Sequence, residues 1–170
     1  MKKILILLAT AFCALLFNAL KAQTAAADNK LSKSTTFRPI PKGPSVYGVF
    51  EGRPPCQAIA RQVDSPVSAE CTKVKWSLVF YQDSVTKQPT VYHLFGRLLP
   101  ADGKWKIIKG IKSNPGAEVF QLETGKPGVY FYFLKGDNNV LFVLDENKAL
   151  RVGNEDFSYT LNRVEPVPGK

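Results

Sequence analysis

Short runs of aromatic and β-branched residues, separated by turn residues, fill the sequence from residue 46 to residue 164. In the run 73–80, Val74, Trp76, Leu78 and Phe80 occupy every second position, which is typical of a strand with one buried face. No long segment has the 3.6-residue apolar period of a helix, and only 57–63 could hold a short one. The predicted strands are 46–51, 73–80, 90–98, 104–111, 118–123, 129–134, 140–144, 150–152 and 157–164.

Turn residues between these runs predict how the strands connect. Asp102-Gly103 is a hairpin signal before the run 104–111, and Gly136-Asp137-Asn138 leads into the run 140–144. Strands that are neighbours in sequence tend to pair, so consecutive hairpins favour an up-and-down order. Closure of the sheet protects both of its edges. We therefore predict an all-β fold, a small antiparallel up-and-down (lipocalin-like) barrel of about eight strands.

The amino terminus has the pattern of a secretory signal. Lys2 and Lys3 precede an almost wholly apolar run at 4–17, and Ala22 is a small residue at a suitable cleavage point. We expect residues 1–22 to be a cleaved signal peptide. The mature protein is then periplasmic or secreted, with no stable membrane anchor.

Two other interpretations of this amino-terminal segment fit its sequence less well. An uncleaved anchor would need a longer apolar run, and this one is soon broken by Asn18 and Lys21. A lipoprotein would be acylated on a cysteine that ends the signal. Cys13 instead follows Phe12, where a small residue is expected, and the apolar residues 14–17 continue beyond it. Both features favour ordinary cleavage.

Composition then divides the rest of the chain. Residues 23–44 are rich in Ala, Ser, Thr, Lys and Pro, which predicts a flexible leader. Ordered structure is expected to begin near Ser45. The barrel domain is predicted to span 45–165, followed by a short tail at 166–170.

Charge and motif content exclude several functions. Lys and Arg number 23 against 14 Asp and Glu, but they are scattered and form no basic stripe, so we expect no nucleic-acid partner. His93 is the only histidine, and no Gly-rich phosphate loop follows a strand. No Ser–His–Asp arrangement is recognisable. We predict a protein that is not an enzyme and needs no cofactor.

Two cysteines remain after the predicted cleavage, Cys56 and Cys71. An even number of cysteines in an oxidising compartment favours a disulfide. The alternative is a reduced pair that binds a metal such as copper, with His93 as a further ligand.

Aromatic residues supply the candidate ligand-binding positions. Residues 130–133 read Y-F-Y-F, so their rings must lie on both faces of a strand. One face is expected to be core, and the other either packs or contacts a ligand or partner. The candidate ligand-binding residues are Trp76, His93, Trp105 and Tyr132.

A set of short motifs resembles one known family. Residues 48–56 read G-V-F-E-G-R-P-P-C, similar to the G-x-Y-x-G-x-x-P-C that opens the N-terminal domain of the NlpE family of copper-resistance and envelope-stress lipoproteins. Further along, the family's cysteine, three apolar strand positions and turn Asp are matched by Cys71, Val74, Leu78, Phe80 and Asp83. The family's later motifs are matched, in the same order, by G-K-W at 103–105, G-D and L-D within 136–145, and F-S-Y-T-L at 157–161. The resemblance covers about residues 46–164. It implies a lipocalin-like barrel in the cell envelope, in a family tied to copper tolerance and surface-stress signalling.

The chain departs from this family at two points. The family has a C-x-x-C pair, whereas Ile59 stands three places after Cys56 and the second cysteine is Cys71. The family's members are usually lipid-anchored, and the surroundings of Cys13 do not match a lipidation site.

Three hypotheses follow. The first is an exported NlpE-like binding or stress-response module that holds a small apolar ligand or contacts an envelope protein. The second is a copper or heavy-metal resistance protein that uses Cys56 and Cys71. The third is a structural interaction module with a filled barrel.

Overall fold

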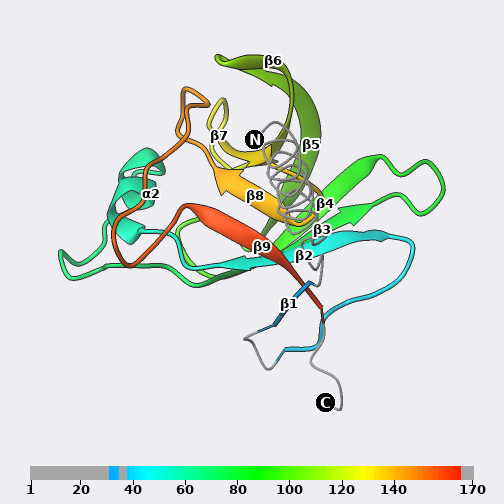
Figure 1. The fold of residues 1–170 in the computed structure, drawn as a ribbon, viewed down its shortest axis with the longest axis horizontal. Coiled ribbons are helices and arrows are strands. Elements are labelled where there is room, and N and C mark those ends of the chain that lie inside the picture. The colour runs from blue at the N-terminus through cyan, green and yellow to red at the C-terminus, as the bar shows by residue number, and fades with distance from the viewer. Residues whose placement is uncertain (1–30, 35–37, 166–170) are drawn as a thin grey trace, which may run out of the picture. The chain divides into compact units, whose positions relative to one another are not determined.

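A computed structural model of the chain describes residues 31–34 and 38–165, and the predicted signal peptide and tail lie outside this part. Nine strands of the described residues form one sheet, and α2 is a short helix (Figure 1). Their bounds are β1 Ser32–Lys33, β2 Val46–Gly52, α2 Cys56–Gln62, β3 Trp76–Gln82, β4 Pro89–Phe95, β5 Asp102–Ile111, β6 Asn114–Glu123, β7 Tyr130–Lys135, β8 Val140–Val143 and β9 Thr160–Glu165. Within the described ranges, no helix has the length and apolar character needed to cross a membrane.

Strands β2 to β9 form a closed antiparallel barrel. Each strand pairs with the next along the chain, and β9 pairs with both β8 and β2, which closes the sheet. The strand order is that of an up-and-down meander. The predicted all-β fold with an eight-stranded antiparallel barrel is therefore confirmed.

Two strand predictions are wrong in detail. Residues 150–152 form no strand beyond a single bridge between Leu144 and Leu150, and Val152 is 90% exposed. Leu150 and Val152 are the two apolar residues of this run, and both are exposed, so the run buries no strand face against the barrel. Asp102-Gly103 lies inside β5 rather than in a turn. A Cβ on Gly103 would lie 2.7 Å from the Tyr92 ring, so this glycine permits close contact between strands.

Side chains fill the interior of the barrel. The buried cluster includes both tryptophans and the rings of Phe80, Phe120 and Phe133, each no more than 3% exposed. The Phe80 ring lies 4.7 Å from that of Trp105 and 5.3 Å from that of Phe120, measured between centroids. These aromatic contacts pack the interior that the described residues enclose, which leaves no open lumen between their side chains.

Helix α2 covers one end of the barrel. Its buried residues Cys56 and Ile59, with Val63 just after it, belong to the interior cluster. The predicted disulfide is present: Cys56 is bonded to Cys71, with the two Cα atoms 5.7 Å apart. The bond fastens the helix to the segment that leads into β3.

Polar side chains close the opposite end. The Arg163 guanidinium lies 4.8 Å from the centre of the Phe50 ring and 5.3 Å from that of Tyr47, and it donates a hydrogen bond to the Tyr47 carbonyl at 2.8 Å. Burial lowers the pKa of Arg163. Nearby, Glu118 accepts hydrogen bonds from Lys135 at 3.0 Å and Lys109 at 3.1 Å, and these lower its pKa. Both ends of the barrel are thus occupied.

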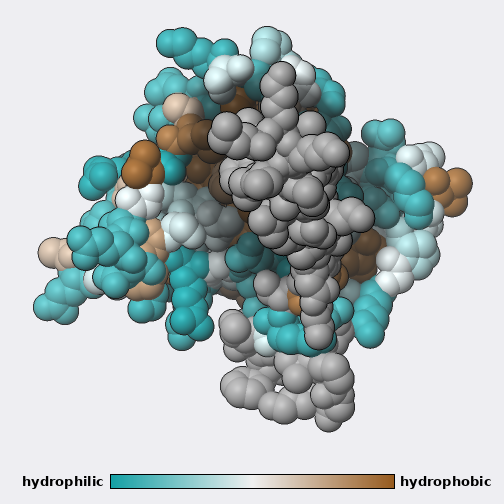
Figure 2. All heavy atoms as spheres, in the orientation of Figure 1, coloured by the Kyte–Doolittle hydropathy of each residue, from teal (hydrophilic) through white to brown (hydrophobic). Residues whose placement is uncertain are grey.

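The segment before β2 packs on the outside of the barrel. β1 pairs in parallel with the end of β9, Ser32 opposite Val164. Ile40 packs against a small cluster on the outer wall formed by Val49, Val79 and Val164. Ordered structure therefore begins upstream of the expected start at Ser45, because this wall has apolar side chains to cover. Elsewhere the face shown in Figure 2 is mostly hydrophilic, with separate hydrophobic patches.

Candidate functional site

The outer wall formed by β9, β2, β3 and β4 carries a cleft that is lined by cationic groups. Successive residues of a strand point to opposite faces, so Glu51 and Ser77 point outward because Phe50, Trp76 and Leu78 point inward. Together with the segment before β2, this wall encloses about 510 Å³. We call this the outer cleft; its lining includes Lys33, Arg38, Glu51, Gly52, Arg53, Lys75, Trp76, Ser77, Phe95, Gly96, Asn162 and Val164.

Four cationic side chains line the outer cleft, and they differ in their partners. Lys33 forms an ion pair with Glu165, and the Arg38 guanidinium lies 4.3 Å from the centre of the Phe95 ring. The side chains of Arg53 and Lys75 are exposed, and neither makes a hydrogen bond or an ion pair with another described residue. Both are therefore available to an anionic ligand, and Arg53 has the donor geometry for a bidentate contact with a phosphate or carboxylate.

A buried carboxylate forms the floor of the outer cleft. Glu51 is 8% exposed and accepts hydrogen bonds from the hydroxyls of Ser34 at 2.9 Å and Ser77 at 3.2 Å. These donors tie the segment before β2 to the barrel wall. Ser77 donates to this carboxylate, and the lining residues that the structure describes include no histidine that could act as a base for its hydroxyl.

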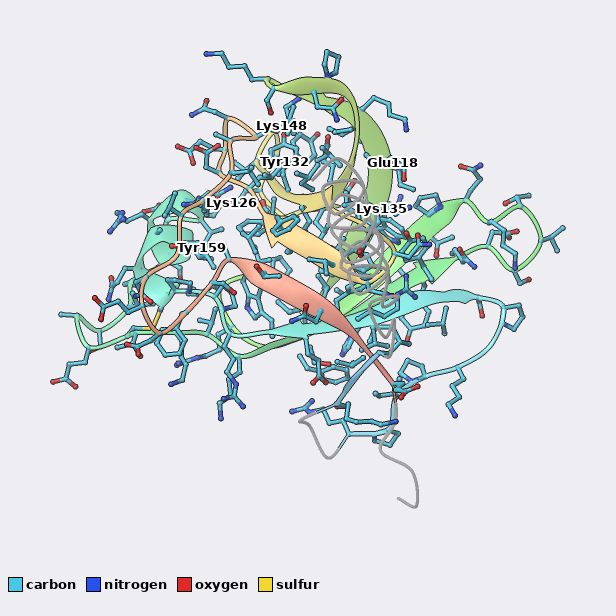
Figure 3. All side chains as sticks on the ribbon, viewed as in Figure 1. Glu118, Lys126, Tyr132, Lys135, Lys148 and Tyr159 are labelled. Carbon is cyan, nitrogen blue, oxygen red and sulfur yellow. A yellow bond between two sulfur atoms is a disulfide. The ribbon has the colours of Figure 1, made fainter. Side chains whose placement is uncertain are left out.

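The predicted ligand-binding residues are not brought together. Trp76 and Trp105 point into the core, where their indole N–H groups donate to the carbonyls of Arg97 at 2.8 Å and Tyr81 at 2.7 Å. Trp76 also borders the outer cleft. His93 lies on the outer wall, hydrogen-bonded through Nδ1 to Asp102, with its ring 4.3 Å from that of Phe95. Tyr132 lies on another part of the wall, on β7, where burial raises its pKa (Figure 3).

The alternative metal ligands are also separated. The Cys56 and Cys71 sulfurs are bonded to each other, which leaves no thiolate for copper. His93 is held by Asp102 on β4 and β5. Among the residues that the structure describes, no three His, Cys, Asp or Glu side chains are grouped as a metal site would require.

Sequence reasoning did not single out Arg38, Glu51, Arg53, Lys75 or Phe95. Alternation along β2 and β3 could have placed Glu51 and Lys75 outside the core, since each sits beside a residue with a strong inward preference. The position of Arg38 over Phe95 depends on how the segment before β2 folds back, for which the sequence contains no local signal.

Comparison of the chain with models of known protein families, with curated proteins and with solved structures finds no match.

Proposed function

We propose that this protein is an exported, non-enzymatic binding module of the cell envelope that binds an anionic ligand in the outer cleft. The observation that carries the proposal is the contrast between a packed barrel interior and a cleft of about 510 Å³ with two unpartnered cations. A ligand inside the barrel would have to displace core rings, whereas a ligand in the outer cleft would complete the charge pairing of Arg53 and Lys75.

The chemistry of the cleft supports a ligand with an anionic group and an apolar part. Arg53 and Lys75 supply the positive charge, and Phe95 supplies an apolar surface. The lining also contains Gly52 and Gly96, where a Cβ would come within 2.5 Å of the Thr160 carbonyl and of the Trp76 ring, so no larger side chain fits at either position. Glu51, held by two serine hydroxyls, would reject an anion placed on the floor and so orient the ligand.

Export and family remain part of this proposal. The disulfide is compatible with an oxidising compartment. The predicted signal at 1–22 lies outside the described residues. From the resemblance to the NlpE family, we propose a role in the envelope stress response. Binding of the ligand in the outer cleft would then act as the stress signal, or would form the contact with an envelope protein.

A tryptophan titration tests the cleft directly. In the variant Trp105→Phe, Trp76 is the remaining tryptophan and it borders the outer cleft. We expect dodecyl phosphate to change its emission and dodecyl maltoside, which is uncharged, to leave it unchanged. Binding should weaken with added salt, because it depends on exposed cations.

A pair of matched charge variants decides the result. The double variant Arg53→Gln with Lys75→Gln should weaken the binding of dodecyl phosphate at least about tenfold. This loss corresponds to roughly 1.4 kcal/mol of binding free energy. Lys112→Gln with Lys148→Gln removes the same charge at positions outside the cleft lining and should leave the affinity for dodecyl phosphate within about twofold. Equal losses in the two pairs, or no change in either, would rule out the outer cleft as the anion site.

A further inference from the structure

A second part of the barrel wall, away from the outer cleft, combines tyrosines with polar side chains. On β5, β6 and β7, Lys106 is paired with Gln121 and Gln121 with Tyr132, and Glu123 is paired with Tyr130. Their side chains point outward, because the alternate residues Trp105, Leu122 and Phe131 belong to the core. We call this the Gln121 face; it consists of Lys104, Lys106, Gln121, Glu123, Tyr130 and Tyr132.

Gln121 is the unusual member of this face. The residue is only 8% exposed, yet its side-chain amide makes no hydrogen bond with any other residue in 31–34 or 38–165. It lines a cleft of about 260 Å³ whose lining also includes Lys104, Lys106, Glu123 and Tyr130. A primary amide has two donors and one acceptor, and in Gln121 no other described residue uses them, while the amide atoms still reach the surface of this cleft. Gln121 is therefore suited to a ligand that offers a donor and an acceptor side by side.

The aromatic rings beside Gln121 indicate which class of ligand would fit this face. The Tyr130 and Tyr132 ring centroids are 6.5 Å apart, and the Lys106 ammonium lies 6.0 Å from the centre of the Tyr130 ring. Tyrosine rings present flat apolar surfaces with a hydroxyl at the edge. A sugar ring matches them, since it has an apolar C–H face and a rim of vicinal hydroxyls.

Charge on the Gln121 face adds a preference for an acid. Neither Lys104 nor Lys106 forms an ion pair or a hydrogen bond within the described ranges. The Glu123 carboxylate can accept from sugar hydroxyls, while the two ammonium groups can pair with a carboxylate on the same chain of sugars. We infer that the Gln121 face binds a saccharide that carries carboxylate groups, with Gln121 hydrogen-bonded to vicinal hydroxyls. The inference is independent of the outer cleft, and either site can fail without the other.

Side-chain amide signals in a ¹H–¹⁵N NMR titration of the whole mature chain test this site. With tetragalacturonate as the ligand, we expect the Gln121 amide pair to shift and the neighbouring backbone signals of β5 to β7 to follow. Maltotetraose, which has similar rings and no carboxylate, should bind at least about fivefold more weakly. Shifts confined to the outer cleft around Arg53 and Lys75, no shifts at all, or equal binding of the two oligosaccharides would overturn the inference.

Variants separate recognition from folding. Gln121→Leu keeps much of the volume and removes the amide, and we expect at least a tenfold loss of tetragalacturonate affinity together with an unchanged or higher Tm. Lys106→Gln should also weaken binding, whereas Gln88→Leu and Lys112→Gln, in turns outside this face, should bind as the parent does. Full affinity in folded Gln121→Leu, or equal losses in the control variants, would show that the amide makes no specific contact.

Discussion

Tyr92 shows how a polar side chain is accommodated within the packed barrel. The residue is 1% exposed, and its hydroxyl donates a hydrogen bond to the Glu123 carbonyl at 2.7 Å. Burial, with smaller contributions from Asp102 and Glu123, raises the pKa of Tyr92 to about 12. The close approach of its ring to Gly103 explains why a pair of residues that reads as a turn lies within a strand.

The ionisation of Tyr92 predicts how stability changes at alkaline pH. Its pKa is higher in the folded chain than the ordinary value of 10.0, so the folded state holds the proton more tightly. The stabilisation is complete below pH 10 and is lost as the pH rises toward about 12, by up to about 2 kcal/mol. The free energy of unfolding, measured with urea between pH 9 and 12, should fall as the pH rises. In the variant Tyr92→Phe this fall should be smaller. An equal slope in the variant would contradict the assignment.

Gly103 provides a second prediction at this scale. In Gly103→Ala, the new Cβ would lie 2.7 Å from the Tyr92 ring, and overpacking of this kind costs about 1–3 kcal/mol. In the control Gly116→Ala, the nearest atom would be Asn114 Oδ1 at 3.5 Å, and we expect a change below about 0.5 kcal/mol. Thermal or urea unfolding of both variants measures the difference, and equal stabilities would show that Tyr92 moves freely.

Among the elements, α2 depends most on a covalent link. The Cys56–Cys71 bond joins residues 15 apart in sequence. Gln57 strengthens the same connection, since its side-chain N–H group lies within hydrogen-bonding distance of the carbonyls of Ser68, Ala69 and Cys71, at 2.9, 3.2 and 3.2 Å. The helix is therefore held both by the disulfide and by local hydrogen bonds.

Removal of the disulfide should destabilise the protein without changing the fold. In the chain-entropy estimate, a loop of this length contributes about 3 kcal/mol. We expect Cys56→Ser with Cys71→Ser to lower the free energy of unfolding by about that amount while the β-sheet circular dichroism spectrum is retained. Reduction of the parent protein should have the same effect, and reduction should leave the double variant unchanged. If the double variant were as stable as the parent protein, packing alone would hold α2 in place and the disulfide would contribute no stability.

Elements also show what the sequence can and cannot predict. The strands of the barrel are predictable because inward apolar residues such as Trp76, Leu78 and Phe80 repeat at every second position. β1 was missed because a two-residue strand has no period, and its partner Val164 lies 132 residues further along the chain. The predicted strand at 150–152 is wrong because Leu150 and Val152 lie in the exposed connection before β9, and the sequence does not show whether a short run is paired.

For the barrel as a whole, the packed interior makes a strong prediction. Phe120 is fully buried and contacts the rings of Tyr47, Phe80 and Trp105. Phe120→Ala should lower the free energy of unfolding by about 3–5 kcal/mol, because it removes a large ring from a dense core. Urea unfolding checks the value, and a loss below about 1 kcal/mol would mean that the interior is loosely filled.

The same interior predicts a negative result for apolar ligands. Fatty acids should leave the emission of Trp105 unchanged in the variant Trp76→Phe, because the described core offers them no open lumen. A saturable change in that emission would restore the hypothesis of a ligand inside the barrel. The filled barrel could be predicted only as one of three possibilities, since the sequence gives the inward residues but not how closely their rings pack.

The pairing of β1 with β9 has a consequence for chain connectivity. Ser32 opposite Val164 and Lys33 opposite Glu165 bring the two ends of the folded domain into register on the same wall. Joining these ends with a short linker and opening the β5–β6 hairpin between Lys112 and Ser113 would give a circular permutant with every strand pair of the barrel intact. Because the strand pairs form a closed cycle, the chain could begin and end in another loop of the barrel without the loss of any strand pair.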